Sequence, residues 1–161
     1  LIISQAHPPD TAILLKQQFQ LGLKIPHVAS SAATMPTVHS LVGPAMEGIY
    51  AEAVAEPNFD TDPDMRAWTK KYIAKFNMKP DSYAPPYYDA ANLLFEAIKA
   101  VGTDRAKIAE HMRKMKFEGV TGSYKFDKEQ SGAFFARMLK YHMEGGVATP
   151  VVVKKYDFSG K

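Results

Sequence analysis

The opening stretch LIISQAHPPDTAILLKQQFQLGLKIPHV, residues 1–28, decides the fold class of this chain. Residues 1–4 predict a short strand, which ends at residues 8–10 because two prolines interrupt strand pairing. From Thr11 apolar residues recur at helical spacing until Gly22, and residues 23–28 predict a second buried strand. A strand, a helix and a strand this close together form a βαβ unit, which favours an α/β fold with a parallel sheet covered by helices.

The next segments extend this unit. Residues 29–34 are small and polar and follow the second strand, at the kind of strand end where open α/β sheets bind ligands. Residues 48–54 predict a third strand. Thr61 or Asp62 is then expected to cap a helix whose first residue is Pro63. The apolar positions of this helix fall on one face and are expected in the core: Met65, Trp68, Tyr72, Ile73 and Phe76.

Residues 77–86 contain three prolines and predict a linker or crossover segment. A long helix is expected at residues 87–101, and a second helix, capped by Thr103, is expected to pack against it as a hairpin. The apolar face of the second helix holds Ile108, Met112 and Met115. The buried side of the long helix is expected to hold Leu94, Ala97, Ile98 and Val101.

The last part of the chain predicts turns and strands. Turns are expected at Gly122 and at residues 127–132. Residues 134–142 and 151–158 predict two strands joined at residues 144–146, which indicates an antiparallel pair.

Composition excludes several classes of protein. The chain has 161 residues, a net charge of +3 and no cysteine, which excludes disulfide scaffolds, zinc ribbons, thiol enzymes and iron–sulfur proteins. No apolar run approaches the 18 or so residues that a membrane span needs. The lysines are spread along the chain with acidic residues between them, so a solvated surface explains the charge better than a nucleic-acid site.

Catalytic and metal motifs fail when their spacing is checked. Asp60, Asp62 and Asp64 alternate as in a calcium loop, but the positions that require glycine and a bidentate acid hold Met65 and Lys71. The histidines lack HExxH spacing, and the chain has no GxSxG, GxGxxG or GxxxxGK[ST] motif. What remains is a site built from strand-end loops and a few aromatic residues. This pattern favours binding without catalysis and without a metal or other cofactor.

Several short motifs follow one another along the chain: Pro9-Asp10 before a helix, Gly22-Leu23-Lys24-Ile25-Pro26, Glu47-Gly48-Ile49-Tyr50, Tyr88-Asp89-Ala90-Ala91, and Val120-Thr121-Gly122 with Phe126-Asp127 and Gly132. In this order they resemble the periplasmic leucine/isoleucine/valine-binding proteins, the type I solute-binding components of ABC importers. The resemblance covers essentially the whole chain. Because members of that family are about twice this long, it implies that the chain corresponds to their carboxy-terminal half.

The resemblance also implies a division of the chain and a location. Residues 1–81 would belong to the second α/β lobe, residues 82–131 would return to the first lobe, and residues 132–161 would cross back. The helical hairpin and the antiparallel strand pair would then belong to the crossovers and the other lobe. A periplasmic location is implied, with any signal peptide lying outside the sequence given.

Three positions match ligand contacts of the family. His7 matches a position that often holds an aromatic residue, Ser31 matches the acid that pairs with the ligand ammonium, and Tyr88 matches an aromatic wall of the side-chain pocket. Ser30 lies in the same loop as Ser31 and completes the predicted ligand-binding set. Structural alternatives stay open: His7 could end a strand, Ser31 could cap a helix starting at Thr34, and Tyr88 could belong to the core.

Ser31 differs from the family pattern, which has an acidic residue at this position, and the difference bears on the ligand. An unpaired buried ammonium loses several kcal/mol, whereas a serine hydroxyl offers a neutral hydrogen bond worth about 1 kcal/mol. The ligand therefore need not be an α-amino acid, and aromatic or aliphatic carboxylates, amides and other small polar metabolites are equally open. The residues that hold the ligand carboxylate would lie in the other half of the protein.

The expected partners are a small-molecule ligand and an ABC permease, with no nucleic acid. The expected apolar face of the helix at residues 87–101 would lack its partner in this chain, so self-association is expected. Two alternatives remain. A sensor or receptor domain of the same fold would bind similar ligands without a transporter, and a small hydrolase would use Ser30 or Ser31 with His7.

Overall fold

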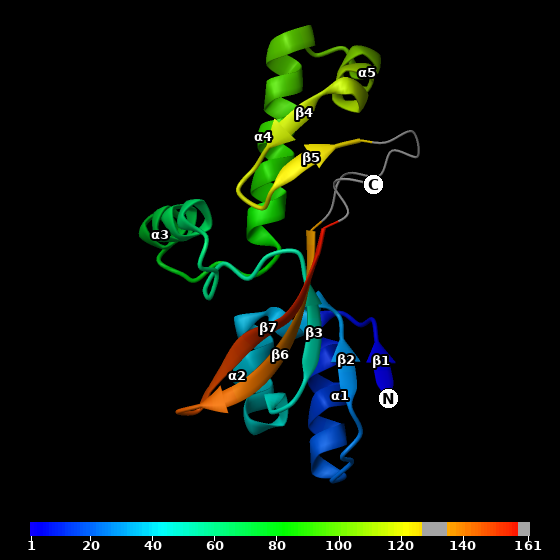
Figure 1. Cartoon of the computed structure of the whole chain (residues 1–161), viewed down its shortest axis with the longest axis vertical. Helices are drawn as coiled ribbons and strands as arrows, with labels where there is room; N and C mark the ends of the chain where they lie inside the picture. The colour runs from blue at the N-terminus through cyan, green and yellow to red at the C-terminus, as the bar shows by residue number, and fades with distance from the viewer. Residues whose placement is uncertain (127–134, 158–161) are drawn as a thin grey trace.

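The computed structural model describes residues 1–126 and 135–157. Three short parallel strands, β1 (Ile2–Ser4), β2 (His27–Ala29) and β3 (Tyr50–Ala53), form one side of a sheet. The antiparallel strands β6 (Phe135–Glu144) and β7 (Val147–Asp157) extend it in the order β1-β2-β3-β6-β7 (Figure 1). The predicted βαβ unit and α/β class are confirmed. The sheet is mixed, because β6 pairs antiparallel with β3.

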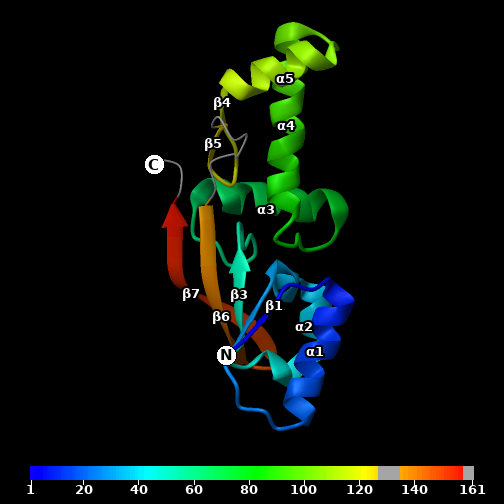
Figure 2. The same ribbon diagram turned by 90° about the vertical axis from the view of Figure 1, so that its right-hand side faces the viewer.

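Helices α1 (Pro8–Gln20) and α2 (Pro36–Val42) cover one face of this sheet (Figure 2). Two short 3₁₀ helices flank α2, namely η1 (Ser31–Thr34) and η2 (Gly43–Met46). A helix from Thr34 is predicted only as an alternative, whereas α2 starts at Pro36, and the strand predicted for β2 is too long. Leu23 and Ile25, expected in that strand, are 45% and 39% exposed and precede it.

The alternation along β3 shows how the sheet is packed. Ala51 and Ala53 are fully buried and belong to the core, whereas Tyr50 and Glu52 point to the opposite face and are half-buried. This is the period-two pattern of a strand covered by helices on one side. The core is completed by α1, α2, β6 and β7 through residues that include Leu15, Val38, Met46, Leu139 and Tyr141.

Helix α3 (Pro63–Phe76) begins as the sequence predicts. The Asp62 side chain accepts hydrogen bonds from the backbone N–H groups of Asp64 and Met65 at 2.9 and 3.1 Å, and Pro63 is the first helical residue. Met65 and Trp68 are buried in a small second core. The prediction that the whole stripe is buried is wrong for Ile73 and Phe76, which are 38% and 52% exposed. They lie at the end of the helix, where no other element covers them in the described residues.

A second group of elements lies at the top of Figure 1. Helix α4 (Ala84–Val101) packs on α5 (Arg105–Lys114), which confirms the predicted hairpin. Strands β4 (Lys116–Glu118) and β5 (Ser123–Lys125) pair as an antiparallel ribbon around the turn at residues 119–122. Even α4 is not apolar enough to cross a bilayer, and neither is any other helix of the described residues.

Two details of this hairpin correct the sequence prediction. Helix α4 starts three residues early, at Ala84, and its buried positions are Pro85, Asp89, Leu93 and Ala97. Leu94 is 39% exposed instead, because the buried stripe recurs every four residues and contains a polar one. The cap of α5 is Asp104 rather than Thr103, since its carboxylate accepts from the Lys107 backbone N–H at 3.0 Å.

The antiparallel pair predicted near the end of the chain is confirmed. Strands β6 and β7 pair over their whole length and are joined by Gly145 and Gly146, with φ values of 56° and 83°. Two consecutive positive φ angles are what a tight two-residue hairpin requires, and glycine adopts them at little cost. The turn predicted at residues 127–132 lies outside the described residues.

Candidate functional site

The carboxyl ends of β1, β2 and β3 meet at one edge of the sheet because the three strands are parallel. The Ser30 hydroxyl donates to the carbonyl of Ala6 at 3.0 Å and ties the loop after β2 to the loop after β1. His7 follows Ala6, at the N-cap position of α1, where its exposed side chain makes no capping bond. The structure thus brings together the two loops that hold His7, Ser30 and Ser31.

Ser31 is held by two residues from other parts of the chain. Its hydroxyl lies 2.8 Å from the Tyr83 hydroxyl, and its backbone N–H donates to Glu52 Oε1 at 3.1 Å. We call Ser30, Ser31, Glu52 and Tyr83 the strand-end site. Ser31 is the first residue of η1, and its side chain makes no capping bond, so the alternative that it caps a helix is wrong.

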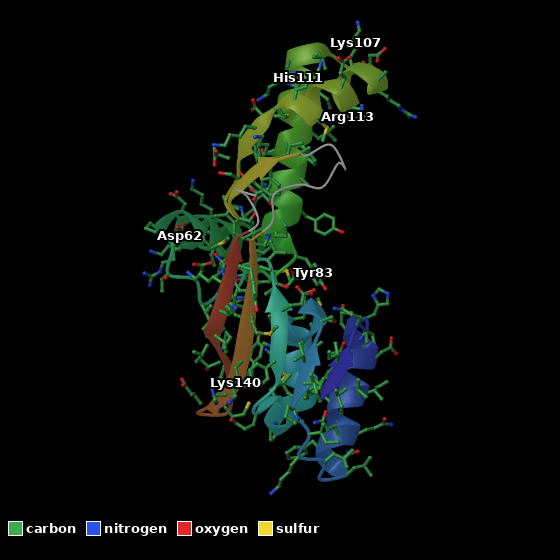
Figure 3. The ribbon with its side chains drawn as sticks, turned by 45° about the vertical axis from the view of Figure 1, so that its right-hand side comes forward. Asp62, Tyr83, Lys107, His111, Arg113 and Lys140 are labelled. Atoms are coloured by element: carbon green, nitrogen blue, oxygen red, sulfur yellow. The ribbon has the colours of Figure 1, made fainter. Side chains whose placement is uncertain are left out.

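Sequence reasoning missed both Glu52 and Tyr83. Figure 3 places Tyr83 between α4 and the strand ends, in the segment that was expected to be a linker. Glu52 carried a usable signal, because it alternates with Ala51 and Ala53 and so must leave the core. Its contact with Ser31 joins residues 21 positions apart and follows only from the pairing of β2 with β3.

Tyr88 packs against α3 in the structure. It lies on α4, is 49% exposed, and contacts Trp68 of α3 edge-to-face, with ring centroids 5.7 Å apart. Part of the ring therefore packs on the second core, and part is free to contact a ligand. The ligand roles of His7, Ser30, Ser31 and Tyr88 stay predictions.

The hydrogen bonds do not favour the hydrolase alternative. The Ser30 and Ser31 hydroxyls pair with Ala6 and Tyr83, and neither pairs with His7 in the described residues. A different serine, Ser4, lies 2.8 Å from Nε2 of His27, whose Nδ1 is 2.6 Å from Oε1 of Gln18. Gln18 is neutral and cannot stabilise an imidazolium, and burial lowers the pKa of His27. Ser4 also lies within β1 and not on a strand-to-helix turn.

The largest of the four cavities identified, about 490 Å³, lies at the opposite end of the sheet. It is lined by residues that precede β2 and β3, among them Leu23, Ile25 and Gly48. Ligands of open α/β sheets bind at the carboxyl ends of the strands. We therefore place the candidate site at the strand-end site, although its residues line none of the four cavities identified.

Buried polar contacts join the sheet to the upper elements of Figure 1. Thr34 donates to the Ser82 hydroxyl at 2.5 Å, and Arg137 forms an ion pair with Asp60 at 3.0 Å in which both side chains are largely buried. Burial raises the pKa of Glu56 to about 8, and the nearby Tyr141 hydroxyl and Arg137 cation reduce that effect. The junction next to the strand-end site is thus fixed by specific polar pairs.

Comparison with known proteins agrees with this architecture. The leucine-, isoleucine-, valine-, threonine- and alanine-binding protein of Pseudomonas aeruginosa is 28% identical over 122 residues, which are 75% of this chain and 32% of that protein. Among solved structures, a leucine-binding protein from Thermotoga maritima superposes with a TM-score of 0.79 at 24% identity over 99% of this chain and 44% of that one.

A solute-binding protein of an ABC transporter from R. palustris, solved in complex with benzoate, gives a TM-score of 0.77 at 21% identity over 99% of this chain and 44% of its own. The chain thus spans about a third of the curated relative and less than half of the solved structures. The model of the family described as periplasmic binding protein matches residues 1–145. The chain therefore belongs to the periplasmic binding protein family.

Proposed function

We propose that this chain is part of a periplasmic solute-binding protein that captures a small molecule without changing it and delivers it to an ABC permease. The observation that carries the proposal is the strand-end site itself. The hydroxyls of Ser31 and Tyr83 and the carboxylate of Glu52 converge at the carboxyl ends of parallel strands, and no nucleophile there is paired with a base in the described residues. Such a set can orient a polar ligand but lacks the groups for acyl transfer.

The ligand class follows from Glu52. Ser31 alone offers only a neutral hydroxyl, but Glu52 places a carboxylate 3.1 Å from the Ser31 backbone N–H. No Lys or Arg of the described residues forms an ion pair with this carboxylate. A ligand ammonium would supply the missing positive charge, so we propose amino acids ahead of simple carboxylates. The relatives support both classes, since one is named for leucine and another was solved with benzoate.

Isothermal titration calorimetry with four probes tests this proposal. Leucine carries both charges, 4-methylpentanoate lacks the ammonium, isoamylamine lacks the carboxylate, and benzoate is aromatic. We expect leucine to bind this chain with a dissociation constant above about 1 µM, because one wall of the site would be missing. Glu52→Gln keeps an oxygen for the Ser31 N–H and should abolish the preference of leucine over 4-methylpentanoate.

The matched control is Glu47→Gln, which also removes one charge. Glu47 lies far from the strand ends, where its carboxylate accepts from the Met143 backbone N–H at 2.8 Å. Binding of none of the four probes at millimolar concentration would contradict the proposed function. Equal loss of leucine binding in both variants would contradict the role of Glu52 only.

We also propose that the isolated chain self-associates through α4. Tyr87, Leu94 and Phe95 of this helix are 74%, 39% and 55% exposed, which leaves an apolar face in water. Light scattering over a wide concentration range should show a growing mean mass. A strict monomer, or a Phe95→Lys variant with unchanged association, would contradict this proposal.

A further inference from the structure

Asp89 is a fully buried carboxylate on α4, with 1% of its surface exposed. Its Oδ1 accepts from the Val120 backbone N–H at 2.8 Å, and its Oδ2 accepts from the Thr121 backbone N–H at 2.9 Å. The hydroxyls of Thr121 and Tyr124 also donate to Oδ2. All four donors belong to the β4–β5 ribbon and its turn. A buried carboxylate that has hydrogen-bond donors in place of a cation depends on each of them.

Tyr124 is suited to this role. Burial raises its pKa to about 12, and the charge of Asp89 adds to the effect. The hydroxyl therefore keeps its proton at any ordinary pH and remains a donor at 3.1 Å from the carboxylate. Its ring packs on Phe117, with centroids 6.1 Å apart, so both strands of the ribbon are fixed around Asp89.

The same turn reaches the aromatic residues of the second core. Val120, whose N–H binds Asp89, packs its side chain against the cluster of Ala55, Met65 and Trp68. Tyr88 precedes Asp89 on α4 and also contacts Trp68. The carboxylate therefore fixes the rotation of the first turns of α4 relative to the turn that supports Trp68.

We propose that Asp89 is a positioning residue for Tyr88: by clamping α4 to the turn at residues 119–122, it holds the Tyr88 ring edge-to-face on Trp68 and leaves the exposed part of the ring free to contact a ligand. Asp89 itself is buried and touches no ligand. The ligand contact of Tyr88 rests on the proposed function, whereas the clamp stands on the contacts given above. The clamp joins two segments, Tyr88-Asp89 and Val120-Thr121-Gly122, that are separate motifs in the sequence.

Trp68 allows the clamp to be tested without a ligand, because it is the only tryptophan of the chain. Asp89→Asn turns one acceptor into an NH₂ group, which must face either the Val120 or the Thr121 N–H. We expect the Trp68 emission to shift to longer wavelength, and acrylamide quenching to rise about twofold, as Tyr88 leaves the indole. Tyr88→Leu should give the same shift, and the double variant should add nothing to it.

Asp104→Asn is the matched control, since Asp104 caps α5 through a single bond to the Lys107 N–H. An unchanged Trp68 emission in a folded Asp89→Asn protein, or an equal shift in Asp104→Asn, would overturn the proposal. If Asp89→Asn loses its circular dichroism, Tyr124→Phe replaces it, because this change removes one donor and keeps the ring. A smaller shift in the same direction is then expected, and no shift would overturn the clamp.

Titration of the folded variants with leucine and benzoate separates the clamp from the proposed function. If wild type binds a probe, Asp89→Asn should lower its affinity at least about tenfold while Asp104→Asn does not. Equal affinities would overturn the role of the clamp in binding. If neither probe binds wild type while the emission results hold, the clamp stands and the proposed ligands are wrong.

Discussion

Replacing Gly119 by alanine tests how closely the turn at residues 119–122 approaches α4. A Cβ built on Gly119 would lie 2.4 Å from both Cγ and Oδ2 of Asp89 and 2.7 Å from Oδ1. Ordinary contacts of this kind are 3.4 Å or longer. The backbone of Gly119 has no positive φ, so the change introduces no backbone strain and its effect is steric.

The size of the effect follows from these distances. The carboxylate would have to retreat by about 1 Å, which stretches its bonds to the Val120 and Thr121 N–H groups from 2.8 and 2.9 Å to nearly 4 Å. A hydrogen bond to a charged group contributes about 1.5–3 kcal/mol. Loss of two such bonds predicts that Gly119→Ala lowers the free energy of unfolding by roughly 3–6 kcal/mol.

Urea unfolding followed by circular dichroism measures this change, with Gly48→Ala as the control. Gly48 has a φ of 76° and no atom within 4 Å of the place that an alanine methyl would take, so alanine there costs only the left-handed backbone, about 1–2 kcal/mol. In an Asp89→Ala background, Gly119→Ala should cost less than about 1 kcal/mol, because the carboxylate is gone. A cost of Gly119→Ala that is no larger than that of Gly48→Ala, or that is the same in both backgrounds, would refute the reasoning.

Three further predictions concern other charged groups. Glu56→Gln should stabilise the protein increasingly from pH 5 to pH 8, by up to about 5 kcal/mol. A carboxyl group whose pKa is raised on folding contributes stability at low pH, and this contribution is lost as pH rises. Urea midpoints of the variant and wild type that change in parallel with pH would contradict this prediction. Arg137→Ala should lower the free energy of unfolding by about 3–5 kcal/mol, because it leaves Asp60 buried without its cation. A decrease of less than about 1 kcal/mol in the same assay would contradict this prediction, because water would then solvate Asp60 in place of Arg137. Asp62→Ala should cost about 1 kcal/mol and reduce helicity through loss of the α3 cap, whereas Thr61→Ala, beside it, should have no such effect.

The elements that sequence reasoning predicted are those set by local rules. Residues 1–29 form β1, α1 and β2 because a short β-branched run is followed by a segment of helical period between proline and glycine stops. Asp62 caps α3 and the glycine pair closes the β6–β7 hairpin for equally local reasons. Helix α2 also begins with a proline, Pro36, and is followed by a glycine, Gly43, with a φ of 56°. It was predicted only as an alternative because it has only seven residues, no side-chain cap and two buried positions.

The candidate site was predicted only in part, because its geometry depends on pairs far apart in sequence. The loops that hold His7, Ser30 and Ser31 could be placed together from strand order alone. The contact of Ser31 with Tyr83 joins residues 52 positions apart and requires the segment before α4 to return to the ends of the strands. Nothing in the local sequence around Tyr83 specifies that return.

Three carboxylates break the local rules and mark where distant segments meet. Asp89 is unfavourable inside a helix, Glu52 is unfavourable in a strand, and Glu56 is buried where a charge is costly. Two of them are explained by a partner from elsewhere: the β4–β5 ribbon for Asp89 and the η1 turn for Glu52. Glu56 is compensated only in part, because burial raises its pKa and Arg137 of β6 only reduces that rise, while its buried Oε2 has no hydrogen-bond partner among the described residues. An acidic residue in such a position indicates that a segment distant in sequence packs against it or that the residue has a function. The three acids lie at the clamp, at the strand-end site and at the junction next to that site. These are the three places where a ligand-binding role can be tested.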